Sequence, residues 1–159
     1  MRIGLDFDNT IACYQEIFLQ VARDQGVISE DWRGGKAQLR NELLSRSEGE
    51  LKWQRLQGQV YGRYMHRASV FPEIVNFLLR LKARGIEFMI VSHKTEYGHY
   101  DLEKIPLRQE ALNWLESKNF FGDQGLGLNR DCVYFADTRK EKVERIKHLK
   151  CDVFIDDLL

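Results

Sequence analysis

Residues 2–10 read RIGLDFDNT, and the expected architecture of the 159-residue chain follows from them. Their side chains alternate with the period of two that is typical of a β-strand, with Ile3, Leu5 and Phe7 on one side and Gly4 and Asp6 on the other. The strand then runs into a sequence of the kind that favours turns, Asp8-Asn9-Thr10. We therefore predict a first strand, and the alternative to a functional role for Asp6 and Asp8 is that they are turn residues at its end.

Three more strands are predicted farther along the chain, each preceded by a helical pattern, at residues 86–91, 132–136 and 153–155. Pro72 and Pro106 each begin a helix at a position where the missing N–H is tolerated. Thr138 and Glu141 have the spacing of a capping box, which predicts a third helix. Strands that alternate with helices predict an α/β fold, a Rossmann-like parallel sheet with helices on both faces.

Residues 13–70 do not follow this alternation. They are predicted to be mostly helical, with breaks at Gly26 and at Arg33-Gly34-Gly35 and helices at 16–25, 36–45 and 50–66. We therefore predict two parts, an α/β core of residues 1–12 and 71–159 and a small helical insertion of residues 13–70.

The charge of the chain is balanced, with 24 basic and 24 acidic residues. Proteins that bind nucleic acid or a membrane surface usually carry a basic excess, so we expect neither partner. The sequence also contains no apolar run long enough to span a bilayer and no recognisable secretory signal. Its three cysteines lack metal-ligand spacing and are expected to be reduced thiols of a cytoplasmic protein.

Polar side chains follow all four predicted strands: Asp6 and Asp8, then Ser92, then Lys140 or Lys142, and finally Asp156 and Asp157. Ligands bind at this edge of open α/β sheets, so we expect these groups to meet. Several carboxylates in one cleft repel one another unless a cation lies between them, and hard oxygen ligands suit Mg²⁺. A hydroxyl and an ammonium group beside them suit the oxygens of a phosphoryl group. The sequence therefore predicts a Mg²⁺-dependent phosphoryl-transfer site.

These clusters resemble the four motifs of the haloacid dehalogenase-like (HAD) superfamily. Asp6-Phe7-Asp8-Asn9-Thr10 is similar to its DxDxT signature, and Val91-Ser92 ends an apolar strand as the second motif does. Lys142 lies shortly before the last strand, and Phe154-Ile155-Asp156-Asp157 is similar to the acidic fourth motif. All four occur in the order of the family, and the resemblance spans the chain apart from the insertion.

The resemblance implies a phosphatase that acts on a small phosphorylated metabolite. Asp6 would attack phosphorus and become an aspartyl-phosphate. Asp8 would protonate the leaving oxygen and then activate the hydrolytic water, a form of catalysis typically worth about 10²–10⁴-fold. An acid–base aspartate at this position favours prompt hydrolysis over storage of the phosphoenzyme.

The resemblance also implies two sets of ligands. The phosphoryl group would be bound by Ser92, Lys142 and Thr10, with Lys140 as the open alternative to Lys142. The Mg²⁺ ion would be held by Asp6, the backbone carbonyl of Asp8 and Asp156, with Asp157 acting through water or orienting the other ligands.

Three further expectations concern the surroundings of this site. The insertion falls where the superfamily places type 1 caps, which close over the active site. The polar loop of residues 93–101 is long for its position and is expected to line the substrate entrance; whether His93, His99 and Asp101 bind a second metal stays open. The resemblance also leads us to expect a further helix after Asp157, but the given sequence ends at Leu159. A minimal fold, a homo-oligomer and a longer natural chain are the alternative explanations.

Two rival functions are consistent with parts of this pattern. Receiver domains of signalling proteins also combine an aspartate acceptor with an acidic pair, a hydroxyl and a lysine, but there the acidic pair comes first in the chain. A non-catalytic domain that binds a phosphorylated ligand would keep the same motifs, but it would have no use for Asp8 as an acid and base.

Overall fold

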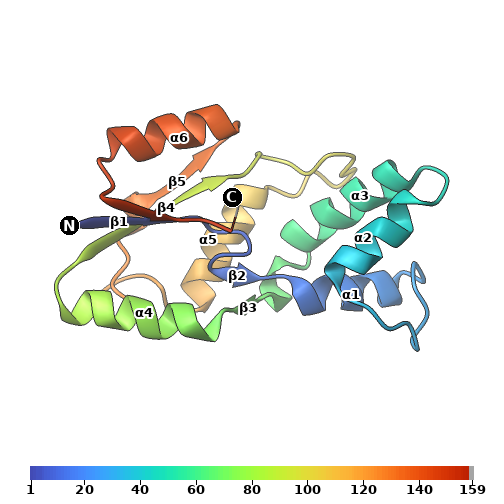
Figure 1. Cartoon of the computed structure of the whole chain (residues 1–159), viewed down its shortest axis with the longest axis horizontal. Helices are drawn as coiled ribbons and strands as arrows, with labels where there is room; N and C mark the ends of the chain where they lie inside the picture. The colour runs from blue at the N-terminus through green and yellow to red at the C-terminus, as the bar shows by residue number, and fades with distance from the viewer. Residues whose placement is uncertain (158–159) are drawn as a thin grey trace. The chain divides into compact units, whose positions relative to one another are not determined.

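The computed structural model describes residues 1–157 and contains a four-stranded parallel sheet (Figure 1). The spatial order of its strands is β5-β4-β1-β6, with bounds Val133–Ala136, Glu87–His93, Arg2–Leu5 and Val153–Ile155. In the register of the sheet, Ile3 lies opposite Phe88 on one side and Val153 on the other. All four strands predicted from the sequence are confirmed, and the fold is α/β and Rossmann-like.

Three helices connect these strands, namely α4 (Pro72–Ala83), α5 (Leu107–Ser117) and α6 (Arg139–His148). From β1 the chain passes to β4 and then to β5 in one direction, and α6 carries it back across the sheet to β6. Connections between parallel strands are right-handed, so a reversal of direction places the connecting helix on the other face. Figure 1 shows α4 and α6 on opposite faces of the sheet, which confirms the predicted covering of both.

This strand order creates a switch point between β1 and β6. The two strands are adjacent although nearly the whole chain separates them, and the direction of the connections reverses between them. Crevices at the carboxyl ends of strands beside such a reversal are where open α/β sheets bind ligands. The switch point is therefore the first place to look for a functional site.

Strand β1 is buried on both of its faces, as expected for a central strand of a covered parallel sheet. Leu5 and the following Phe7 have no exposed surface. Gly4 faces the other way, and a Cβ atom there would lie 2.5 Å from Cδ2 of Phe154. Glycine at position 4 thus allows the ring of Phe154 in β6 to pack directly against the backbone of β1.

The chain divides into two compact units. The first contains the sheet and consists, within the described residues, of Met1–Cys13, Ser69–Thr95 and residues 112–157. The second consists of Tyr14–Ala68 and Glu96–Ala111. Residues 96–111, which were predicted to belong to the α/β core, instead group with the helical residues. Residues 96–111 pack closely against the helical residues at two glycines of the second unit. A Cβ atom on Gly98 would lie 2.8 Å from Cα of Gly58.

The second unit contains three helices and a short 3₁₀ helix: α1 (Gln15–Asp24), α2 (Lys36–Leu44), α3 (Gly49–Tyr61) and η1 (Met65–Arg67). The single helix predicted at 50–66 is thus two elements, since the chain turns at Gly62. Aromatic rings fill the interior, where Phe18 stacks on Trp53 with a centroid distance of 5.1 Å. No helix among residues 1–157 combines the length and apolar character needed to cross a membrane.

A short antiparallel ladder, absent from the sequence prediction, marks the point where the chain leaves the first unit and returns to it. It pairs β2 (Ala12–Cys13) with β3 (Ser69–Val70). A further 3₁₀ helix, η2 (Arg130–Cys132), precedes β5, so that the predicted third strand begins one residue later than expected.

Candidate metal and phosphate site

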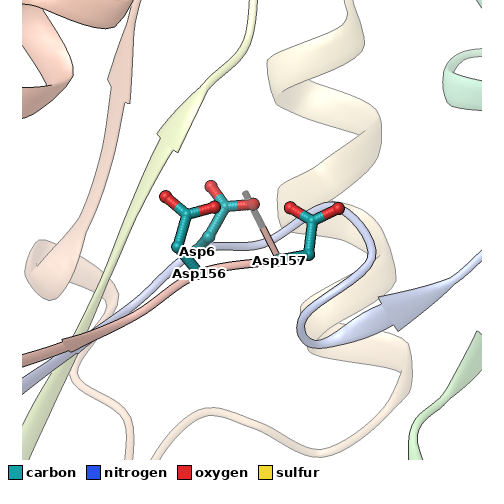
Figure 2. Close-up of side chains that lie close together, drawn as sticks. All are labelled: Asp6, Asp156 and Asp157. Atoms are coloured by element: carbon teal, nitrogen blue, oxygen red, sulfur yellow. The ribbon is translucent and has the colours of Figure 1, made fainter. Parts of the chain in front are cut away.

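Three carboxylates meet at the switch point of the sheet (Figure 2). Asp6 directly follows β1, and Asp156 and Asp157 directly follow β6. The ladder continues into this region, because the backbone N–H of Asp6 donates to the carbonyl of Ile155 at 2.8 Å. One carboxylate oxygen of each aspartate lies within 4.8 Å of those of the other two, and Figure 2 shows the three groups side by side at the strand ends.

The geometry of this acidic cluster is close to what a small divalent cation requires. Oxygens bound to one Mg²⁺ ion at about 2.0–2.1 Å are at most about 4.2 Å apart. The oxygens of Asp6, Asp156 and Asp157 lie within 4.8 Å of one another, slightly beyond this limit. Their chemistry, hard carboxylate oxygen, is also the type that Mg²⁺ prefers.

Lys142 is the cation that the structure brings to these carboxylates. Its Nζ atom lies 2.7 Å from Oδ1 of Asp6 and 2.7 Å from Oδ2 of Asp156. Each of these carboxylates has a second oxygen, so the contacts with Lys142 leave ligand atoms that can face a metal ion. Lys142 is buried in the first turn of α6, whereas the side chain of Lys140 is 86% exposed and lies near Glu144. Of the two lysines that the sequence left open, only Lys142 contacts Asp6 in the described residues.

Burial and neighbouring charges shift the pKa values of this cluster. Burial raises the pKa of Asp6 to about 6, and this effect outweighs the opposing hydrogen bond from Lys142. Burial alone would lower the pKa of Lys142, but its hydrogen bonds to Asp156 and Asp6 prevail and raise it. Burial and the adjacent charge of Asp156 also raise the pKa of Asp157. Three carboxylates also face only one ammonium group, so burial and charge both favour the binding of a proton or a metal cation.

A tight turn after β1 places Asp8 and Thr10. Asn9 adopts a left-handed conformation with φ of 60°, which asparagine tolerates better than most residues. The turn closes through backbone hydrogen bonds from Ile11 and Ala12 to the carbonyl of Phe7, both 3.0 Å long. The chain thus forms a turn at Asp8-Asn9-Thr10, as the residue types there favour.

Two buried hydroxyl groups near the strand ends lack a hydrogen-bond partner among residues 1–157, Oγ of Ser92 and Oγ1 of Thr10. Ser92 belongs to β4, the neighbour of β1, and is 1% exposed. Leaving a buried hydroxyl unpaired typically destabilises a protein by about 1–3 kcal/mol, so such groups call for a functional explanation. Both can donate to an anionic oxygen, the role that the resemblance implies for them.

Asp8 has a partner that the sequence analysis did not assign to the site. Nζ of Lys94 lies 3.0 Å from Oδ1 of Asp8 and 2.9 Å from its Oδ2. The side chain of Lys94 is 2% exposed and that of Asp8 19% exposed. The sequence could have indicated Lys94, because Ser92 and Lys94 are two positions apart at the end of a strand and so project toward the same face of the sheet.

Hydrogen bonds are made both at the end of β4 and in the loop after it. His93 donates from Nε2 to the carbonyl of Asp137 at 3.0 Å. Farther along, the carboxylate of Asp101 accepts from the backbone N–H groups of Glu103 and Ile105. Within residues 1–157, His93, His99 and Asp101 do not form a cluster that could hold a metal ion.

Comparisons with known proteins identify no family for this chain. A scan against models of protein families gives no match, and a search of curated proteins gives none either. Membership in the HAD superfamily therefore stays a prediction from the four motifs.

Proposed function

We propose that this chain is a Mg²⁺-dependent phosphatase that hydrolyses the phosphate monoester of a small metabolite through an aspartyl-phosphate on Asp6. One observation carries the proposal: the ammonium group of Lys142 bridges Asp6 and Asp156 where β1 and β6 meet, beside a third carboxylate. Three carboxylates in this cluster, those of Asp6, Asp156 and Asp157, face one ammonium group, that of Lys142. The remaining charge of two is the charge that one divalent cation neutralises.

In the first step, a carboxylate oxygen of Asp6 attacks phosphorus and the bond from phosphorus to the ester oxygen breaks. Asp8 delivers its proton to that oxygen, so the alcohol leaves uncharged. The hydroxyls of Ser92 and Thr10 donate hydrogen bonds to the non-bridging oxygens. The ammonium group of Lys142 stabilises the negative charge that Asp6 and the phosphoryl group bring together.

In the second step, Asp8 acts as a base. Its carboxylate takes a proton from a water molecule, whose oxygen attacks phosphorus and breaks the acyl-phosphate bond. Inorganic phosphate leaves, Asp6 is restored as a carboxylate, and Asp8 holds the proton needed for the next turnover.

The residues that would hold the metal are Asp6, Asp156 and Asp157, with the backbone carbonyl of Asp8. When bound, Mg²⁺ supplies positive charge that stabilises the transferring phosphoryl group and orients it toward Asp6. The same carboxylates without a cation would repel a phosphate dianion.

The test is turnover of p-nitrophenyl phosphate by the full chain, with MgCl₂ or with EDTA. We expect activity that requires Mg²⁺ and that falls by at least about 10³-fold in Asp6→Asn, as is typical when a nucleophile is removed. Asp152→Asn, at the other end of β6, is the matched control and should leave activity unchanged.

Two results would reject the proposal. Turnover that survives Asp6→Asn excludes this residue as the nucleophile. Binding of phosphate without turnover of any ester, in a panel that includes aryl, sugar and nucleoside phosphates, indicates the non-catalytic binding domain instead.

A further inference from the structure

Lys94 is a buried lysine that the phosphatase steps described above leave without a role. Its side chain is 2% exposed, and its ammonium group contacts both oxygens of Asp8 at 3.0 and 2.9 Å. Burial of an ammonium group is unfavourable unless the group is paired. The position of Lys94 beside the site therefore calls for an explanation. Surface lysines, by contrast, are common and need none.

Lys94 is itself held in place. Its backbone N–H donates to the carbonyl of Ala136 at 3.0 Å, which extends the pairing of β4 with β5 by one residue. Its Nζ also lies 5.4 Å from the centroid of the Phe7 ring, within the range of a cation–π interaction. The ammonium group is thus fixed by the sheet, and it can fix the side chain that it contacts.

Asp8 needs such support more than Asp6 does. Asp6 directly follows a strand, whereas Asp8 lies in the turn beyond Phe7 and is partly exposed. A carboxylate that transfers a proton must keep its oxygen within hydrogen-bond reach of the leaving oxygen. A contact with both oxygens restricts rotation of the carboxylate as well as its position.

We propose that Lys94 is a positioning residue, which holds the carboxylate of Asp8 in the orientation required for proton transfer to the leaving group. This inference rests on the proposed phosphatase function. It adds a residue from the loop after β4 to the machinery, and it predicts a selective defect that loss of stability alone would not produce.

The experiment compares two esters that differ in how much they need a proton donor. The p-nitrophenolate of p-nitrophenyl phosphate leaves readily without protonation, whereas the phenolate of phenyl phosphate is more basic and depends on it. The ratio of kcat/KM for the two esters is measured, because kcat/KM covers the steps up to departure of the alcohol and excludes the later attack of water.

In Lys94→Met we expect kcat/KM for phenyl phosphate to fall by about 10²-fold, the lower end of what general acid catalysis contributes, and that for p-nitrophenyl phosphate to fall by less than about 10-fold. Lys94→Arg, which keeps the charge and can still contact both oxygens, should bring the ratio back toward that of the wild type. Lys147→Met, an exposed lysine of α6, is the matched control and should change neither value.

A double-mutant cycle identifies Asp8 as the group through which Lys94 acts. Asp8→Asn should change the ratio as Lys94→Met does, and the double variant should be no worse than Asp8→Asn. Thermal unfolding shows whether Lys94→Met is folded. If it is not, Lys94→Gln, which keeps a hydrogen-bond donor, is used for the same test.

The outcomes separate this inference from the proposed function. An equal fall for both esters in the Lys94 variants, or an additive double variant, overturns the positioning role while the phosphatase stands. A wild-type protein that hydrolyses neither ester, nor any of the panel, overturns both.

Discussion

At the scale of single residues, Asp6 is a buried carboxyl group whose ionisation lowers the stability of the fold. Its side chain is 8% exposed, and the effect of burial on its pKa outweighs that of the hydrogen bond from Lys142. A carboxyl group that is more easily protonated in the folded than in the unfolded chain stabilises the fold only while it is protonated. The proposed nucleophile therefore lies where its charge is unfavourable unless a cation binds beside it.

The pH dependence of unfolding tests this argument in metal-free buffer. The folded-state pKa of Asp6 is about 6, against 3.8 for the unfolded chain. The stabilisation is thus complete below the unfolded pKa and lost as pH rises through the folded one. Between about pH 4 and about pH 7, Asp6 should lower the free energy of unfolding by up to about 3 kcal/mol.

Asp6→Asn isolates this contribution from those of other groups. Chemical denaturation across the same pH range should show the variant gaining stability relative to the wild type as pH rises. The raised pKa of Lys142 acts only at alkaline pH and leaves this range unaffected. A difference between the two proteins that stays constant with pH would show that Asp6 is not shifted upward.

At the scale of elements, α6 matters because it delivers Lys142 from its first turn. Oγ1 of Thr138 accepts a hydrogen bond from the backbone N–H of Glu141 at 3.1 Å, as the capping-box spacing predicts. The side chain of Glu141 reaches back to the N–H of Asp137 at 2.9 Å. These two contacts hold the start of the helix, and through it the position of the lysine.

Thr138→Ala removes the acceptor at this helix start and should lower the free energy of unfolding by about 1 kcal/mol. Fraying of the first turn should also loosen Lys142, so we expect a higher KM for p-nitrophenyl phosphate. Thr138→Ser keeps the acceptor oxygen and serves as the control, with stability and KM close to those of the wild type. Equal losses in both variants would show that the threonine methyl group, rather than the cap, is important.

At the scale of the whole molecule, the strand order decides what the acidic residues can do together. Asp6 lies near one end of the chain and Asp156 near the other, and only the pairing of β1 with β6 brings them to the same cluster. A cation bound there would connect both ends of the fold. Binding to the folded chain alone would then stabilise it.

Addition of MgCl₂ near neutral pH should therefore raise the midpoint of thermal unfolding. At a concentration about 100-fold above the dissociation constant, the gain in stability should be about 2.7 kcal/mol. The gain should shrink below about pH 6, where protons compete with the metal for Asp6, whose pKa is raised to about 6.

Two controls define this effect. NaCl at the same ionic strength should produce little of it, since screening alone does not require a specific site. Asp156→Asn should remove most of it, because one ligand and one charge are lost. An equal response of wild type and variant to MgCl₂ would argue against a metal site at the switch point.

Sequence reasoning identified most of the elements and the residue types of the site. Local patterns were sufficient for this, because each of them involves only a few neighbouring residues. They are the alternation of side chains in the first strand, the prolines that begin helices and the capping pair at Thr138. The predicted boundaries were less accurate where a local turn intervened, as at Gly62, which separates α3 from η1.

The sequence by itself determined the α/β alternation and the acidic, hydroxyl and lysine groups that follow the strands, because these depend on neighbouring residues. Only the tertiary structure decided the strand order, the choice of Lys142 over Lys140, and the pairing of Lys94 with Asp8. Lys142 and Asp6 are separated by 136 positions and Lys94 and Asp8 by 86. Contacts over such distances depend on how the strands pair and which face each helix covers, and no short-range pattern specifies that.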